Sequence, residues 1–212
     1  MDRVDGYPLF VLGTVLLPSE QTALHVFEQR YRELAARCIE NDEPFGFVLA
    51  DGNGNPGEFG CATKITQVIE TYADGELDIL VEGVAPIRLI EVENRFSYPS
   101  AVVEQLDDAP PQPGDEQQSV LARVAFTKLL EAMALPPIED AVLATMSSYA
   151  MAAHVDLDPA DKQALLESRE EGERFALLER VFAEGAQRAA IARRVAGIAK
   201  SNGHGRRNRP GA

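Results

Sequence analysis

Short apolar runs separated by turn residues fill the first half of the chain and predict a β structure. The predicted strands are 9–12, 15–17, 23–27, 45–49, 61–71, 76–81, 86–91 and 101–106. Between two of these runs, Asp74-Gly75 predicts a tight hairpin, because such turns need residues that tolerate positive φ. The run 28–40 differs, since its apolar residues recur every three or four positions and predict one amphipathic helix. Short strands at short intervals indicate a small barrel or a folded sheet.

The second half of the chain reads as helical. Three prolines and a glycine between 107 and 115 can neither continue a strand nor form a helix interior, so they predict a boundary. The predicted helices are 117–134, 139–154, one that starts at Asp158-Pro159 and contains 161–167, and 170–200. We therefore expect an α+β fold with a β-rich subdomain (1–106), a Pro-rich linker (107–116), a four-helix subdomain (117–200) and a disordered basic tail (201–212).

Charge is distributed unevenly along the chain. Residues 1–185 hold 13 Lys/Arg against 34 Asp/Glu, a net charge of −21, whereas residues 186–212 hold seven Lys/Arg and no acid. An acidic body repels phosphate, so the balance argues against nucleic-acid binding. The basic end has three interpretations, which are a solvated tail, a contact for an acidic partner or nucleic acid, and a segment that folds back on its own body. The solvated tail is the simplest of them.

The location and redox state follow from what the sequence lacks. No apolar run approaches the roughly 20 residues that span a bilayer, and no secretory signal opens the chain. We therefore expect a cytoplasmic protein without a membrane partner. Cys38 and Cys61 do not form a Cys-x-x-Cys pair, so they are expected to be buried free thiols in a reducing compartment.

Residues that would carry catalysis or bind a metal occur without the required patterns. No Gly-Lys pair exists, so the phosphate-binding loop of an ATPase is missing. Ser147-Ser148 has no surrounding Gly-x-Ser-x-Gly turn, which argues against a hydrolase of that type. The histidines His25, His154 and His204 lie far apart and have no second ligand at metal spacing. We expect no enzyme activity, no cofactor and no metal, and we expect His25 to be a packed or half-exposed strand residue.

The opening of the chain, 7–18 followed by 22–32, resembles the start of the N-terminal domain of Lon proteases. The matching residues are Pro8, Leu9, Gly13, Val15, Pro18, Leu24, His25, Phe27, Glu28, Arg30 and Tyr31. Ser19, Ala23 and Gln29 depart from the family pattern at positions that concern turn geometry. Residues 74–83 followed by 88–90 resemble the family's central hairpin, and residues 152–154 with 161–167 resemble its helical half. The resemblance thus extends over most of 7–185.

This resemblance implies a PUA-like β pseudo-barrel with one helix, followed by helices, and a module that meets substrate before an ATPase unfolds it. In Lon-like proteases the last helix runs on as a connector to that ATPase, whereas here it is expected to stop near Ser201. The prediction is a freestanding, non-catalytic protein- or peptide-recognition module whose partners are unfolded or other proteins. An adaptor or regulator of a separate ATP-dependent protease is one alternative. A PUA-like nucleic-acid-binding module is another, which the acidic body disfavours.

The contact surface of such a module is expected to be apolar and partly aromatic, because peptide-binding sites bury apolar side chains. Five aromatic residues of the β half are the candidates for peptide contact: Phe27, Tyr31, Phe45, Phe47 and Tyr72. Aromatic residues are also the usual material of a core. The sequence alone does not separate these two roles.

Overall fold

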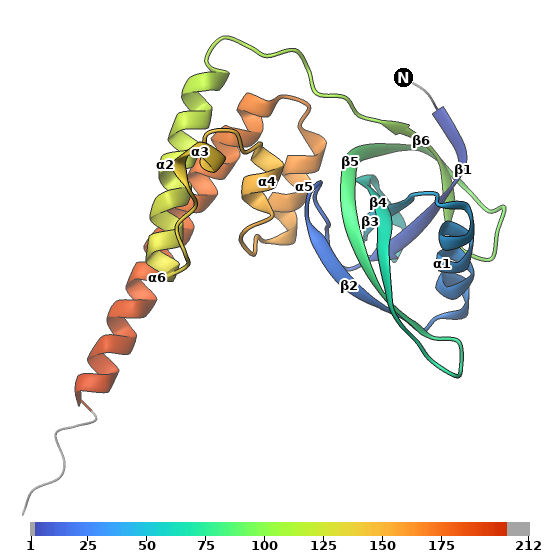
Figure 1. The fold of residues 1–212 in the computed structure, drawn as a ribbon. Helices are drawn as coiled ribbons and strands as arrows, with labels where there is room; N and C mark the ends of the chain where they lie inside the picture. Colours follow the sequence, from blue (N-terminus) through green and yellow to red (C-terminus); the bar gives the residue numbers. More distant parts are fainter. Residues whose placement is uncertain (1–2, 203–212) are drawn as a thin grey trace, which may run out of the picture.

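The computed structural model describes residues 3–202, with side chains described as far as Val195. A β barrel forms from the first half of the chain and a group of helices from the second (Figure 1). The barrel half consists of β1 (Arg3–Leu12), β2 (Gln21–Val26), α1 (Gln29–Asn41), β3 (Phe45–Ala50), β4 (Pro56–Thr71), β5 (Leu77–Glu93) and β6 (Ser100–Gln105). The α+β fold predicted from the sequence is confirmed.

The six strands form one sheet in the order β2-β5-β4-β3-β1-β6. β1 and β3 run parallel, and the other neighbours are antiparallel. A further antiparallel pairing of β5 with β6 closes the sheet into a ring. β5 can reach both partners because it is 17 residues long, so that its first part pairs with β2 and its last part with β6. The predicted pseudo-barrel with one helix is therefore confirmed.

Helix α1 and the β4–β5 hairpin form as their local patterns predict. α1 buries one face, made by Tyr31, Leu34, Ala35 and Cys38, against the barrel. The hairpin turns at Gly75, whose φ of 87° lies in the left-handed region that glycine tolerates. Both elements are specified by neighbouring residues, which is why sequence periodicity and turn chemistry were sufficient to predict them.

Two predictions about the strands are wrong. Segment 15–17 is not a strand, because it forms no ladder with a neighbouring strand, and the only pairing beside it among the described residues is an isolated bridge between Pro18 and Gly83. Val15 and Leu17 pack towards the helices and Leu16 packs into the barrel. Segments 76–81 and 86–91 are parts of one strand, β5. Gly83 lies between them without ending the strand. Its missing side chain lets the carbonyl oxygen of Leu17 approach, where a Cβ would lie only 2.1 Å away.

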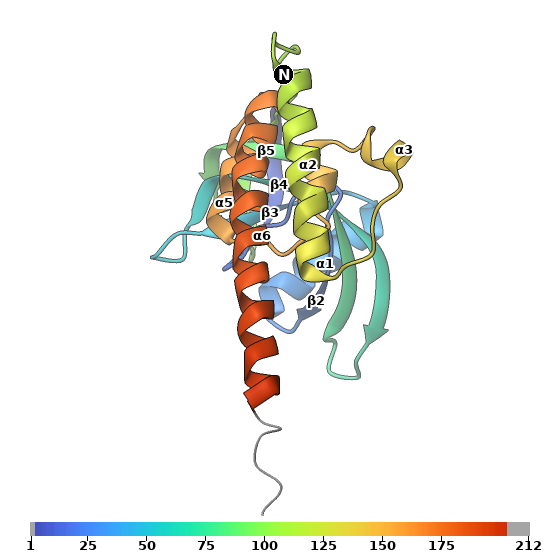
Figure 2. The same ribbon diagram turned by 90° about the vertical axis from the view of Figure 1, so that its left-hand side faces the viewer.

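The helical half consists of α2 (Asp115–Met133), α3 (Asp140–Leu143), α4 (Ser148–Ala152), α5 (Pro159–Glu167) and α6 (Glu171–Asn202). α2 and α6 lie alongside each other over much of the length of α2, and α6 continues beyond it (Figure 2). Small and apolar residues fill their interface, with Phe126 and Phe182 in contact at a ring separation of 5.0 Å. α5 starts with Asp158 at its N-cap position and Pro159 in its first turn, as predicted.

The helix predicted over 139–154 is broken into α3 and α4. Arg123 of α2 explains part of the break, because its guanidinium donates hydrogen bonds to the carbonyl oxygens of Leu143 (2.8 Å) and Met146 (3.2 Å). Those carbonyls therefore find partners outside a continuous helix. Ser147 then starts α4 as its N-cap, accepting a hydrogen bond from the backbone N–H of Ala150. The donor that permits the break comes from another helix, so the periodicity of 139–154 could not reveal it.

The barrel and the helices share a core. One cluster of buried residues joins Val15, Leu17 and Cys61 of the first half to apolar residues of α2, α4, α5 and α6. Lys162 of α5 adds a buried ion pair to Glu20, which precedes β2. The segment between β6 and α2 contains no helix or strand. The division into two subdomains with a linker stays a prediction, and the shared core places the two halves against each other.

Two further predictions concern the end of the chain and the membrane. Of the tail predicted over 201–212, Ser201 and Asn202 belong to α6, and the rest lies outside the described residues. Within residues 3–202, none of the helices combines the length and the apolar character that crossing a membrane would need.

Candidate functional site

The β4–β5 hairpin extends beyond the ring of strands as an arm (Figure 1). The pairing of β3 with β4 ends at Phe45 and Thr63, whereas β5 stays paired with β4 as far as Thr71. From Lys64 to Thr71, β4 is therefore bonded to β5 on one side only. No other strand within residues 3–202 pairs with its second edge. Every side chain from Thr66 to Thr71 is exposed.

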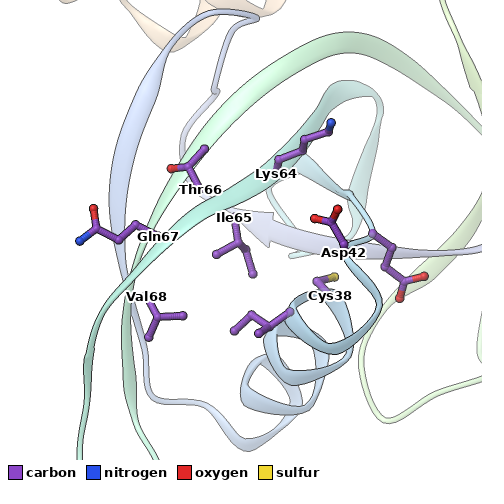
Figure 3. A pocket seen from close by; sticks show the side chains of 9 residues that line it. Cys38, Asp42, Lys64, Ile65, Thr66, Gln67 and Val68 are labelled. Carbon is purple, nitrogen blue, oxygen red and sulfur yellow. The ribbon is translucent and has the colours of Figure 1, made fainter.

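A groove lies between this open edge and the C-terminal part of α1 (Figure 3). Its volume is about 190 Å³, and it is lined by Cys38, Ile39, Asp42, Glu43 and the β4 residues 64–68. Ile65 is half-buried and packs on the barrel core, while Ile39 and Val68 are 42% and 40% exposed. The groove thus offers an apolar wall that solvent can reach. A space of this size holds one or two side chains and is smaller than a typical small-molecule site of about 300 Å³ or more.

The charged groups around the groove have different partners. Glu43 forms an ion pair with Arg37, which also donates to the Tyr98 hydroxyl at 3.0 Å and lies over the Phe96 ring. Lys64 has no carboxylate within ion-pair distance among the described residues. The Cys38 thiol closes the floor of the groove. Burial, reinforced by the nearby Glu43 carboxylate, raises the pKa of this thiol to about 12, so it stays protonated at neutral pH.

The opposite face of the arm carries a cluster of aromatic and acidic side chains, which we call the His25 cluster: His25, Phe27, Tyr72, Glu76 and Asp78. The His25 ring lies between the rings of Phe27 (6.0 Å) and Tyr72 (5.8 Å). Its Nδ1 contacts Asp78 Oδ1 at 2.7 Å and its Nε2 contacts Glu76 Oε2 at 3.1 Å. The Tyr72 hydroxyl donates to Asp78 Oδ2 at 2.7 Å.

These contacts shift the titration of the His25 cluster. The hydrogen bond to Asp78 raises the pKa of His25 above its usual value, against a smaller effect of burial. The same hydrogen bond, together with that from Tyr72, lowers the pKa of Asp78. The cluster therefore favours a protonated imidazole beside an ionised carboxylate. His25 is half-exposed on a strand, as the sequence predicted, with a side chain 50% exposed.

The five aromatic residues predicted to contact a peptide separate into two groups. Phe27 and Tyr72 are 58% and 37% exposed and meet in the His25 cluster. Tyr31, Phe45 and Phe47 are buried in the barrel core, at 4%, 0% and 2% exposure. Because these three side chains are covered, the structure removes them from the accessible surface. The contact role of Phe27 and Tyr72 stays a prediction.

Several residues of the site were not predicted from the sequence. Glu76 and Asp78 come next to His25 because β2 pairs with β5 in the register that sets His25 opposite Asp78. Ile39 and Val68 line one groove because α1 lies beside the end of the β3–β4 pairing. For Glu76 and Asp78, the available sequence signal was a histidine on one predicted strand and acidic residues at the start of another. In the described part of the chain, no group of three His, Cys, Asp or Glu residues is arranged to hold a metal ion.

Comparison with known proteins agrees with the sequence resemblance. The family model of the ATP-dependent protease La (LON) substrate-binding domain matches residues 6–184. The Lon protease of Escherichia coli (strain K12) is 28% identical over 167 residues, which cover 69% of this chain and 21% of that protein. The Lon protease of Shigella dysenteriae serotype 1 (strain Sd197) has the same identity, with 20% of its length covered. The chain thus spans about a fifth of the length of these curated relatives.

Two solved structures are similar in fold. The crystal structure of a Lon N-terminal domain protein from Xanthomonas campestris has 25% sequence identity and a TM-score of 0.63, covering 82% of this chain and 97% of that one. The N-terminal domain of a Mycobacterium avium complex Lon protease has 17% identity and a TM-score of 0.70, covering 84% and 98%. The second likeness concerns the fold alone. With the family match over 6–184, this chain belongs to the Lon protease substrate-binding domain family.

Proposed function

We propose that this protein is a non-catalytic recognition module that binds exposed apolar segments of other proteins through the outer arm of the β4–β5 hairpin. The observation that carries the proposal is the groove between α1 and β4. There Ile39 and Val68 remain about 40% exposed at the edge of a strand that has no partner on one side. Membership of a substrate-binding family supports a protein as the ligand.

The size of the groove argues for weak binding. Burying one Val, Leu or Ile side chain contributes about 1.5–3 kcal/mol, whereas a millimolar dissociation constant corresponds to about 4.1 kcal/mol. One anchored side chain therefore gives binding weaker than a millimolar dissociation constant unless other contacts add to it. Phe27 and Tyr72, on the opposite face of the same arm, are the aromatic residues available for such additional contacts. Weak contacts of this kind suit a module that must release its clients.

The proposal can be tested with one model protein in two states. Binding of reduced, carboxamidomethylated α-lactalbumin, which is unfolded and whose thiol caps add no charge, is compared with binding of the native form by fluorescence anisotropy. The unfolded form should bind and the native form should not. Val68→Glu should weaken binding, and Val142→Glu, on α3 and 51% exposed, is the matched control that should not. Equal binding by both variants, or no binding by the parent protein, would contradict the proposal.

A second candidate function, as adaptor or regulator of a separate ATP-dependent protease, is favoured by α6. This helix runs beyond the end of α2 (Figure 2), and Ile191 and Val195, four residues apart on one face, are 64% and 60% exposed. Exposed apolar residues on a helix that few neighbours cover are a typical helix-docking surface. Affinity purification from the source cells should then recover an ATP-dependent protease with the parent protein. The Ile191→Glu variant should lose it, and unchanged recovery by that variant would exclude α6 as the contact.

A further inference from the structure

We infer that the open edge of β4 binds an extended polypeptide strand by backbone pairing, with an aliphatic side chain of that strand seated in the groove against α1. The inference rests on the proposed function and names the conformation and chemistry of the ligand. The expected partner is an unfolded segment that alternates aliphatic and polar residues and carries lysine or arginine at its ends.

The backbone of the arm supplies the first part of the argument. A strand edge without a neighbour presents N–H and C=O groups, and proteins normally cover or distort such an edge. Outside β5, no described residue donates to or accepts from the backbone of 64–71. Six consecutive exposed residues, 66–71, form this edge. β4 has register shifts between Ile65 and Gln67 and between Val68 and Glu70, so these six residues oppose only four residues of β5 and extend over about 13 Å at the usual rise of a strand. This length accommodates a short added strand.

The groove distinguishes this edge from the free edge of β2. β2 also pairs with β5 alone, but its residues line none of the described cavities. Beside β4, by contrast, Ile65 and Val68 face the groove together with Cys38 of α1 (Figure 3). Side chains of a strand alternate between its two faces, so every second residue of an added strand could enter the groove. Backbone pairing then supplies affinity and the groove supplies selectivity.

Charge determines which extended segments are favoured. Residues 1–185 carry a net charge of −21, and Glu70 lies on the arm itself while Asp42 lies at the end of α1. Among the residues that line the groove, Lys64 is the one cation in the described structure. The surrounding negative potential favours association with cationic segments and disfavours acidic ones. A basic, aliphatic and extended segment therefore complements the edge, the groove and the charge together.

Backbone N-methylation separates strand pairing from simple apolar contact. The probe is a fluorescein-labelled seven-residue peptide in which threonine alternates with isoleucine and valine between two terminal lysines. Two further peptides have the same side chains but carry N-methyl groups on one or the other set of alternating residues. An added strand pairs through one edge only. One methylated peptide should therefore bind like the parent, and the other at least about tenfold more weakly.

Variants of the protein connect this binding to the groove. Ile39→Asp should weaken binding of the parent peptide by about tenfold or more, because a charge replaces part of the apolar wall. Val92→Glu, on β5 and away from the arm, is the control with a similar exposed side chain and should bind normally. Circular dichroism of both variants establishes that they are folded. Backbone amides of 66–71 should also exchange hydrogen more slowly when the peptide is bound.

The outcomes separate this inference from the proposed function. If unfolded α-lactalbumin binds but both methylated peptides bind like the parent, the site recognises apolar side chains without strand pairing and the inference fails alone. If unfolded α-lactalbumin binds and none of the peptides does, the inference also fails, because the ligand lies elsewhere on the surface. If neither unfolded α-lactalbumin nor any of the peptides binds, both the proposed function and the inference fail. A difference between the two methylated peptides that Ile39→Asp abolishes is the result that supports strand addition.

Discussion

Replacing Arg174 by alanine should destabilise the fold more than any other single charge removal in the helical half. Its side chain is fully covered, yet it carries a charge and five hydrogen-bond donors. The guanidinium donates to both carboxylate oxygens of Asp108 (2.9 and 2.7 Å), to the Ser148 hydroxyl (2.9 Å) and to the Ser168 carbonyl (2.9 Å). It also pairs with Glu171. These contacts join the segment after β6 to α4 and α6.

The expected loss follows from the exposure of the partners. Breaking a buried ion pair by removing one member costs about 3–5 kcal/mol when the other charge stays buried. Asp108 and Glu171 have side chains 50% and 31% exposed, so water can solvate them after the change, and the lower part of that range applies. The Ser148 hydroxyl, by contrast, is left in the interior without its hydrogen-bond donor. The variant also loses the stacking of the guanidinium over the Tyr149 ring, which lies 4.5 Å away. We expect Arg174→Ala to lower the free energy of unfolding by about 3–4 kcal/mol.

Urea unfolding followed by circular dichroism measures this loss, and a thermal scan should show a decrease of about 6–16 °C in Tm for a chain of this size. Arg180→Ala is the matched control, because Arg180 is 57% exposed and its ion-pair distances are 3.9 and 3.7 Å. That change should cost less than about 0.5 kcal/mol. Arg174→Lys keeps the charge but not the planar fork and should recover only part of the loss. A loss below about 1 kcal/mol for Arg174→Ala would refute the reasoning.

Three further predictions test the core, the thiols and the His25 cluster. Gly83→Ala should lower the free energy of unfolding, measured in urea, by about 2–3 kcal/mol, because its Cβ would lie 2.1 Å from a backbone carbonyl oxygen. Gly52→Ala should cost little, since its Cβ would have no neighbour within 4 Å, and equal losses would contradict this account. Burial raises the pKa of the Cys38 and Cys61 thiols to about 12, so a maleimide at pH 8 should label them only after unfolding. Rapid labelling of the native protein would contradict this prediction, because it would show that the thiols are accessible. The His25 pKa, measured by NMR, should lie above 6.5 and should fall towards 6.5 in the Asp78→Asn variant. The stabilisation from this contact is therefore complete below about pH 6.5 and is lost as the pH rises through the pKa of His25 in the folded protein. An unchanged His25 pKa in the variant would exclude Asp78 as the cause.

The elements that the sequence predicted correctly are those whose cause is local. α1 formed because its apolar residues repeat with helical spacing, and the β4–β5 turn formed because Gly75 tolerates positive φ. α5 began where Asp158 and Pro159 supply a helix start. Each of these signals acts within one turn of chain, so neighbouring residues are sufficient to specify the result.

The errors have non-local causes. The helix predicted over 139–154 breaks because Arg123, on another helix, binds the carbonyl oxygens at the break. Arg174 resembles any surface arginine in sequence, but its guanidinium is buried among partners that include Asp108, 66 positions away, and Ser148 of α4. Periodicity carries no information about such partners. The aromatic residues present the same difficulty, since Phe27 and Phe47 are chemically identical and differ only in whether the closed ring covers them.

By itself, therefore, the sequence determined the α+β class, the succession of a β-rich half and a helical half, the hairpin turn and the resemblance to Lon N-terminal domains, all of which rest on local periodicity, turn chemistry and ordered motifs. Tertiary structure alone decided that β3 stops pairing at Thr63 while β5 continues, that α1 lies beside the edge left open, and that His25 meets Asp78. These features depend on strand register and ring closure. Both are set by the packing of segments far apart in the chain, so no single segment contains the information that specifies the candidate site.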